Sequence, residues 1–216
     1  MRHLEISIPS WFIFKPALQI GIYTKTGGLD VIKQQSVATP VPKDDQVLIN
    51  VKACALNIGD YQRFQTKNGK IPVSTYITNK MMGYVGKPLG TEIAGVVVKT
   101  GKKVSHVKSG DAVFGKTAGT APVGGIAEYA VMDADRVWLK PDNFSFEEAS
   151  TVSISFDTAL GAVRKTDIKP GQNVMVYGAS GGVGLYVVQL AKEAGAIVTG
   201  VCSTRNIELA KAAGLS

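Results

Sequence analysis

The segment "NVMVYGASGGVGLYVVQLA" (residues 173–191) constrains the fold more than any other part of the chain. A β-branched run enters a turn rich in glycine, and an apolar helical pattern leaves it. Glycines allow a tight turn and let backbone N–H groups approach a pyrophosphate, which the helix N-terminus also favours. A strand before the turn and a helix after it predict a dinucleotide site. A turn with a purely structural role is the alternative.

The surrounding sequence extends this motif into a β-α-β unit. Residues 196–202 read "AIVTGVC", a second strand, and a further helical pattern follows it. On the N-terminal side, Ser145 and Glu148 have capping-box spacing, which predicts that a helix begins there. We therefore place a domain boundary near residue 150, with residues 151–216 forming the first part of a nucleotide-binding domain.

The residues after the second strand bear on the choice of nucleotide. NAD-specific folds usually carry an acidic residue there to bind the ribose 2′-OH, whereas this chain reads Cys202-Ser203-Thr204-Arg205. A hydroxyl and a guanidinium bind a 2′-phosphate, which a carboxylate would repel. The pattern favours NADPH. The alternative is that Ser203 caps the last helix and Arg205 is solvated.

Residues 20–150 have a different pattern. They contain many short β-branched segments separated by turn signals, including "QVLINVKACAL", "EIAGVVVKTG" and "DAVFGK", and residues 124–141 supply one more pair of strands. This spacing predicts an antiparallel, barrel-like domain. The irregular stretch 61–87 has the length of a binding loop or lid. Residues 1–19 form an N-terminal extension whose role the sequence leaves open.

Composition excludes several classes of protein. The 216 residues are 45% hydrophobic and 19% charged, which is typical of a globular chain, and no run of about 20 apolar residues suggests a membrane span. The net charge of +7 is dispersed. The densest basic group favours a solvated loop face over a nucleic-acid site; it consists of Lys99, Lys102, Lys103 and Lys108.

The cysteines and histidines favour neither a disulfide nor a metal site. Cys54 and Cys202 lie in apolar strand-like runs, where small buried side chains are usual, and this agrees with a reducing, cytoplasmic setting. His3 and His106 lie far apart in the sequence. We predict that the chain has no tetrahedral zinc site.

Four blocks of the sequence together resemble one family. They are "PKDDQVLINVKACALNIGDY", "PLGTEIAGVVVKTGKKVSHVKSGDAVFG", "GGIAEYAVMDADRVWLKPDNFSFEEA" and "GASGGVGLYVVQLAKEAGAIVTGVCSTRN". In this order they resemble the zinc-free quinone oxidoreductase branch of the medium-chain dehydrogenase/reductase superfamily. The resemblance implies an α/β fold, with a GroES-like β-barrel catalytic domain at 20–150 joined to a Rossmann domain.

The resemblance also implies an activity and catalytic residues. Asn57 and Thr91 stand where zinc alcohol dehydrogenases have Cys and His ligands. The zinc-free branch reduces quinones or α,β-unsaturated carbonyls with NADPH. Asn57 and Tyr61 match its Asn-x-x-Asp-aromatic pattern, in which Trp often replaces Tyr. Asn57 would donate to the substrate oxygen, Tyr61 would donate a hydrogen bond or a proton, and Asp60 would orient the loop.

Further residues match the cofactor positions of the family. Thr158 matches a threonine near the nicotinamide, and Ala179 departs from the glycine of the usual fingerprint, a change this branch tolerates. The pyrophosphate turn corresponds to Ser180, Gly181, Gly182 and Val183.

Compared with the family, the sequence is expected to lack part of the Rossmann domain. Such a domain has six strands, and residues 151–216 supply the first two. Two hypotheses follow. In the first, the chain represents an NADPH-dependent reductase of a small carbonyl or quinone substrate, whose complete form is a possible homo-oligomer. In the second, it is a non-catalytic fragment, inactive alone or acting only through association with a partner.

Overall fold

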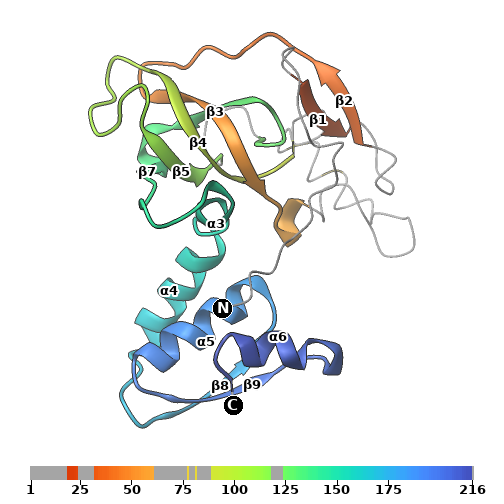
Figure 1. Ribbon diagram of the computed structural model, residues 1–216, viewed down its shortest axis with the longest axis vertical. Coiled ribbons are helices and arrows are strands. Elements are labelled where there is room, and N and C mark those ends of the chain that lie inside the picture. Colours follow the sequence, from red (N-terminus) through yellow and green to blue (C-terminus); the bar gives the residue numbers. More distant parts are fainter. Residues whose placement is uncertain are drawn as a thin grey trace. The chain divides into compact units, whose positions relative to one another are not determined.

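The computed structural model describes residues 19–23, 32–60, 77, 81, 89–117 and 124–215. The chain divides into two compact units, Met1–Glu147 and Glu148–Ser216, which we describe separately (Figure 1). Tyr61, most of the 61–87 loop and residues 1–18 of the N-terminal extension lie outside the described residues.

The first unit is built from antiparallel strands. A five-stranded sheet has the order β6-β3-β4-β5-β7, and β1 pairs with β2 in a separate two-stranded sheet. The β-branched and apolar character of β3 and β4 suits central strands. The strands of this unit are β1 (Gln19–Tyr23), β2 (Ile32–Ser36), β3 (Gln46–Ala55), β4 (Glu92–Thr100), β5 (Ala112–Lys116), β6 (Tyr129–Asp133) and β7 (Val137–Leu139).

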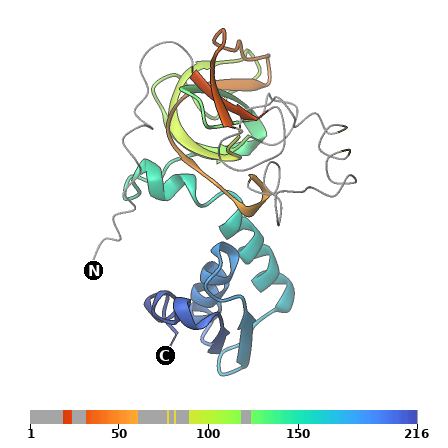
Figure 2. The same ribbon diagram turned by 90° about the vertical axis from the view of Figure 1, so that its right-hand side faces the viewer.

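The predicted antiparallel arrangement is confirmed, but the described residues form no closed barrel. The sheet remains open because β6 and β7 are its edges and pair with no further described strand. It is nevertheless curved (Figure 2), and register shifts at Leu48/Ile49 and Val51/Ala53 add to the bend of β3. Backbone hydrogen bonds from Gly21 to Ile126 and from Leu89 to Gly21 tie β1 to the ends of the sheet.

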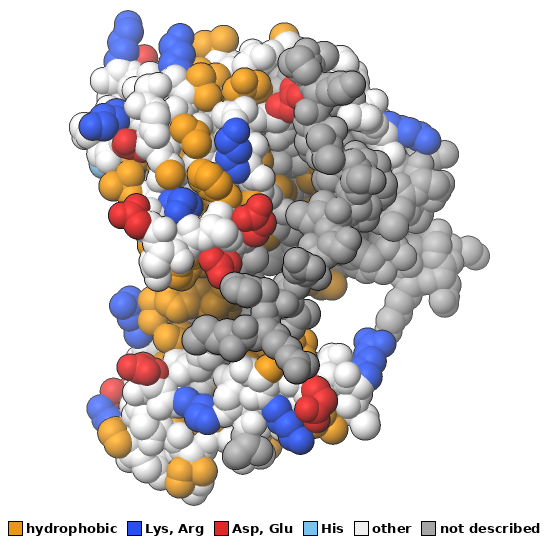
Figure 3. Space-filling model, viewed as in Figure 1, with side chains coloured by type: hydrophobic (Ala, Val, Ile, Leu, Met, Phe, Trp, Pro, Cys, Tyr) orange, Lys and Arg blue, Asp and Glu red, His pale blue; other side chains and the backbone are white. Residues whose placement is uncertain are grey.

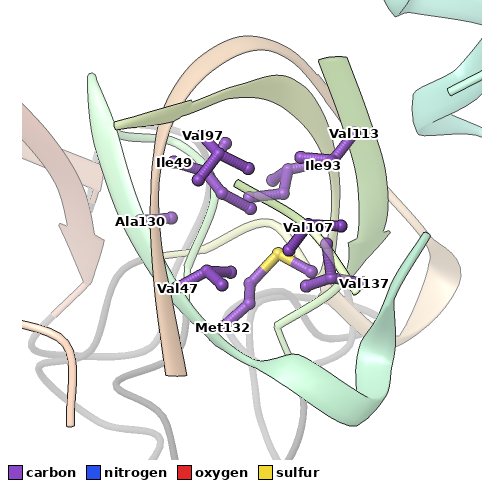
Figure 4. Close-up of a cluster of buried hydrophobic side chains, with 9 residues drawn as sticks. All are labelled: Val47, Ile49, Ile93, Val97, Val107, Val113, Ala130, Met132 and Val137. Atoms are coloured by element: carbon purple, nitrogen blue, oxygen red, sulfur yellow. The ribbon is translucent and has the colours of Figure 1, made fainter. Parts of the chain in front are cut away.

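The core of this unit lies inside the curve of the sheet. Alternate residues of a strand point to the same face, so Val47 and Ile49 of β3 meet Ala130 and Met132 of β6. Figure 4 shows the nine side chains pointing toward one another. The whole buried cluster consists of Val47, Ile49, Ile93, Val97, Val107, Val113, Ala130, Met132 and Val137.

The second unit contains the β-α-β order predicted from the sequence. Strands β8 (Asn173–Tyr177) and β9 (Ile197–Val201) are parallel, and the helix between them, α5 (Gly182–Glu193), makes the crossover that parallel strands require. A short 3-10 turn, η5 (Thr204–Asn206), leads into α6 (Ile207–Ala212). A small apolar core joins the strands to α5 through Val176, Ala179 and Val188.

The helix predicted from Ser145 onward is interrupted. It forms α3 (Phe146–Ser150) and α4 (Ser155–Thr166), with turns between them. The Thr151 hydroxyl donates to the Glu148 carbonyl oxygen at 2.8 Å. The break is explained by Thr151 and the β-branched residues that follow it. The Thr151 side chain competes for a backbone carbonyl oxygen, and β-branched residues are less favourable in a helix.

The surface offers few functional signals. The four lysines singled out above are exposed, and on the face drawn in Figure 3 the Lys and Arg side chains are separated by acidic and uncharged groups. Both cysteines are free thiols. Within the described ranges, every helix is too short or too polar to cross a membrane.

Candidate active site

Asn57 is held at the end of the first unit's sheet by a carboxylate. Strand β3 ends at Ala55, which is in register with Glu92 at the start of β4. The Asn57 side-chain nitrogen Nδ2 donates a hydrogen bond to Glu92 Oε2 at 2.6 Å. Glu92 is buried. A charged acceptor makes this bond stronger than one between neutral groups, so the amide has a defined orientation.

Asp60 organises the backbone around Asn57. Its Oδ2 accepts hydrogen bonds from the Asn57 N–H at 3.0 Å and from the Thr91 hydroxyl at 3.0 Å. Its Oδ1 accepts from the Gly90 N–H at 3.1 Å. The carboxylate is buried and joins the segment after β3 to the segment before β4. These contacts support the interpretation that Asp60 orients the loop.

Only glycine fits at position 90. Its φ of +90° lies in the left-handed region, and an added Cβ would stand 2.3 Å from the Cys54 sulfur. The same close packing affects the thiol: burial, followed by the charges of Asp60 and Glu92, raises the pKa of Cys54 well above its usual range. Cys54 is therefore a protonated, unreactive neighbour of the site.

The two positions that the family resemblance relates to zinc ligands both bind protein carboxylates. Asn57 donates to Glu92 and Thr91 donates to Asp60. Within the part of the chain that the structure describes, no group of three or more His, Cys, Asp or Glu side chains is placed to hold a metal ion.

Apolar side chains flank Asn57 on both sides. Leu56 is 60% exposed and Ile58 is 69% exposed, although both are large hydrophobic residues. An amide donor between two uncovered apolar side chains suits a flat organic substrate with a polar oxygen.

In the second unit, the glycine turn is shaped by its contact with α5. Gly178 has a φ of +78°, and the N–H groups of Gly178 and Ala179 both donate to the Val201 carbonyl oxygen, at 2.9 and 3.0 Å. A Cβ on Gly184 would lie 2.1 Å from the Gly178 carbonyl oxygen. The fold itself therefore requires glycine at 178 and 184.

Gly181 and Gly182 are different, because little in the protein opposes a side chain there. A Cβ on Gly181 would meet only the Gly178 oxygen, at 3.3 Å, and one on Gly182 would meet the Ser155 side chain at 3.1 Å. Both residues are exposed, as is Val183. They lie at the N-terminus of the 12-residue helix α5. Open backbone at a helix N-terminus fits the pyrophosphate of a dinucleotide.

The segment after β9 lies against the same turn. Asn206 Nδ2 donates to Ser180 Oγ at 3.0 Å. Ser203 precedes η5 but makes no side-chain capping bond, contrary to the capping alternative. Arg205 is exposed and has no ion pair within the described ranges. The structure thus brings Ser180 close to the 203–206 segment. Thr158 lies on α4, exposed, with its hydroxyl bonded to the Ile154 carbonyl oxygen at 2.7 Å.

Sequence reasoning missed Glu92 and Asn206 as neighbours of candidate site residues. Glu92 had a detectable signal, since an acidic residue begins an otherwise apolar strand, "EIAGVVV". Asn206 had a weaker one, its place one residue after Arg205.

The first unit is an antiparallel sheet with a held amide, the second is a β-α-β unit with an open glycine turn, and comparison with known proteins identifies the family. A model of the alcohol dehydrogenase GroES-like domain matches residues 43–142. The 2-methylene-furan-3-one reductase of Solanum lycopersicum is 37% identical over 218 residues, which cover 97% of this chain and 52% of the relative. The NADPH-dependent alkenal/one oxidoreductase of Arabidopsis thaliana chloroplasts is 34% identical, covering 89% of this chain and 50% of the relative.

A solved structure agrees with the sequence relatives. The quinone oxidoreductase from Coxiella burnetii superposes with a TM-score of 0.80 at 30% identity, covering 92% of this chain and 61% of that one. The chain belongs to the medium-chain dehydrogenase/reductase superfamily, in its quinone oxidoreductase-like branch. It spans about half the length of the curated relatives it matches.

Proposed function

We propose that the protein is an NADPH-dependent oxidoreductase that reduces quinones or α,β-unsaturated carbonyls by hydride transfer without a metal ion. The observation that carries the proposal is the amide of Asn57, which is held by Glu92 and has the exposed residues Leu56 and Ile58 as its sequence neighbours. The names of the relatives support the same substrate classes and the same cofactor.

The proposed role of Asn57 follows from the charge that develops in such a reduction. NADPH, when bound, would supply a hydride to an electron-poor carbon, and negative charge would then grow on the conjugated oxygen. An oriented N–H donor stabilises that oxygen without having to reorganise. The exposed Leu56 and Ile58 provide apolar contact for the carbon skeleton. We assign to Tyr61, which lies outside the described residues, a second hydrogen bond or the proton.

The cofactor residues proposed here belong to the second unit. Ser180, Gly181, Gly182 and Val183 would hold the pyrophosphate at the N-terminus of α5, and their open backbone supports this assignment. Ser203 and Arg205 would bind the 2′-phosphate, and Thr158 would lie near the nicotinamide. The exposed guanidinium of Arg205 is suited to a phosphate.

We extend the proposal to the organisation of the chain. Residues 20–150 form the GroES-like catalytic domain, and 151–216 form the first part of an NAD(P)-binding Rossmann domain. The partner is a small organic carbonyl or quinone rather than a nucleic acid, the setting is cytoplasmic, and the complete protein forms homo-oligomers.

One observation favours the second candidate function, in which the chain acts only in association with a partner. On one face of the β8–β9 sheet, Met175 is 72% exposed and Tyr177 is 86% exposed. Turnover of quinones and enones by the purified chain distinguishes the two candidates. Reduction by a monomer supports the enzyme, and activity that appears only after addition of a partner supports the second candidate.

The catalytic assignment is tested by Asn57→Ala. We expect the rate of quinone reduction to fall about ten- to a hundredfold, near or somewhat below the effect of a single oxyanion donor. The affinity for NADPH, measured by fluorescence titration, should hardly change. Unchanged turnover would move the donor role to Tyr61 or to backbone N–H groups.

A further inference from the structure

The amide of Asn57 presents an orientation problem that the fold must solve. A side-chain amide has nearly the same shape when it is flipped, but the flip exchanges a donor for an acceptor. A developing oxyanion is stabilised by the N–H end and repelled by the oxygen end. The proposed chemistry therefore needs something that selects one of two otherwise similar states.

Glu92 has the properties that this selection requires. Its carboxylate accepts hydrogen bonds and does not donate them, so it can bind only the Nδ2 end of Asn57, as the 2.6 Å bond shows. Its backbone is fixed at the start of β4, opposite Ala55 of β3 and Lys116 of β5. The side chain is buried, so the acceptor is held by the sheet rather than by a mobile loop.

We infer that Glu92 is a positioning residue for the proposed reduction. It fixes the flip state of the Asn57 amide, so that the amide presents the donor Nδ2 and not the acceptor Oδ1. This rests on the role proposed above for Asn57. Nδ2 carries two N–H groups, and Glu92 accepts a hydrogen bond from one of them. Glu92 itself touches no reacting atom.

Glu92 could act by orienting Asn57 or through its own negative charge, and these two roles make opposite predictions for Glu92→Gln. The negative charge of Glu92 opposes an oxyanion nearby, so its value to the reaction lies in the acceptor and not in the charge. Glu92→Gln keeps an acceptor oxygen of the same reach and removes the charge. Glu92→Met keeps the length of the side chain and removes the strong acceptor. If Glu92 acts by orientation, both variants lower turnover, because Gln can bind either end of the Asn57 amide and Met binds neither. If Glu92 acted through its charge, Gln would raise turnover.

The same sheet contains a matched control. Gln46 is a buried side-chain amide at the start of β3, and its Nε2 donates to Asp133 Oδ1 at 2.8 Å. Asp133→Ala removes a carboxylate acceptor from a buried amide, as Glu92→Met does, but outside the site. Any general effect of losing such a bond on the sheet appears in both variants.

The kinetic test is a double-mutant cycle with Glu92 and Asn57. We expect Glu92→Met to lower kcat about tenfold, part of the effect of one oxyanion donor, with little change in KM. Glu92→Gln should lower kcat about two- to threefold, because its amide can pair with either end of Asn57 and no longer selects one flip state. Added to Asn57→Ala, Glu92→Met should cause no further loss, since residues that act through one another are not additive. Asp133→Ala should leave kcat unchanged.

Additive losses in the cycle, or a Glu92→Gln variant that turns over at least as fast as the unmutated protein, would overturn the inference. If Glu92→Met does not fold, Glu92→Asp is the second variant. It withdraws the acceptor by one methylene and should behave in the same way.

A second measurement does not depend on turnover and separates the inference from the proposed function. In the 15N-labelled protein, the Asn57 side-chain amide is assigned by its loss in Asn57→Ala. We expect its two protons to be widely split, with the splitting reduced in Glu92→Gln and lost in Glu92→Met. Unchanged amide shifts in Glu92→Met would overturn the inference. A changed amide together with no effect of Asn57→Ala on turnover would instead show that the proposed role of Asn57 is wrong.

Discussion

The five-stranded sheet of the first unit and the β8–β9 sheet of the second differ in how fully their own unit buries them. The five-stranded sheet of the first unit encloses a cluster of nine buried side chains, contributed by strands and connections of that unit alone. The β8–β9 sheet buries Val176 against α5, while Met175, Tyr177 and Ile197 remain exposed. The first sheet therefore encloses a core of its own, although Val98, Trp138 and Leu139 remain exposed, whereas the second sheet is covered on one face only.

The difference follows from strand direction. Antiparallel strands joined by short connections can curve around a core that they supply themselves, and one of their faces tolerates water. Parallel strands are normally covered on both faces and carry apolar residues on both. Strands β8 and β9 have this composition, so their exposed face is a place where the second unit is open to association or to local unfolding.

The largest effect should come from the first unit's core. Ile93→Ala removes a side chain with 0% exposure from the centre of the cluster and should cost about 2–5 kcal/mol of unfolding free energy. Ile197→Ala removes the same atoms from a side chain that is 60% exposed and should cost at most about 0.5 kcal/mol. Urea denaturation of both variants provides the measurement. Similar losses would mean that the exposed face is covered in solution.

Hydrogen exchange should show the same contrast in the backbone. In the dilute chain, amides of β3 and β4 should exchange at least about 100-fold more slowly than those of β8 and β9, because each sheet opens separately. The comparison uses residues 47–51 and 93–97 against 173–177 and 197–201. Strong protection of β8 and β9 in a monomer that also binds NADPH would contradict this expectation.

A third test asks whether the second unit alone determines the choice of nucleotide. Arg205→Ala should weaken NADPH binding by roughly 1.5–3 kcal/mol, as expected for a lost hydrogen bond to a charged group. NADH binding should change little, because NADH has no 2′-phosphate. Titrations with both nucleotides provide the measurement, with Arg164→Ala on α4 as a control for loss of an exposed arginine. Equal losses for NADPH and NADH would remove the 2′-phosphate assignment.

The smallest effect concerns the thiol beside the candidate site. The folded state raises the pKa of Cys54, so the folded protein keeps a proton that the unfolded chain loses. Stability is therefore complete below the unfolded-state pKa of roughly 8.5 and falls as the pH rises above it. Between pH 8.5 and 9.5, the raised pKa of Cys54 should lower the free energy of unfolding by about 1 kcal/mol.

Cys54→Ala should remove that part of the pH dependence, whereas Cys202→Ala should keep it. Denaturation curves at the two pH values compare the variants. An identical pH dependence in Cys54→Ala and in the unmutated protein would show that the thiol is not shielded.

Much of the local structure could be predicted from the sequence. The antiparallel strands of the first unit, the β-α-β order of the second and the glycine turn follow from residue spacing and from the conformational freedom of glycine. The break between α3 and α4 was missed because the Thr151 side chain competes with the helix for a backbone carbonyl oxygen. The predicted barrel-like domain is confirmed as an antiparallel sheet, but the described strands do not close it, since strand patterns do not say which edges pair.

The family, the order of the elements and the residue types available for chemistry could be predicted from the sequence, because these depend on local pattern and on recognisable blocks. Which residues meet depends on how the strands pair in three dimensions. Strands β6 and β7 are neighbours in the chain but lie at opposite edges of the sheet. Asn57 meets Glu92, 35 positions away, because β3 and β4 pair in a register that brings Ala55 opposite Glu92. Such contacts depend on strand pairing between distant segments, which no local pattern encodes.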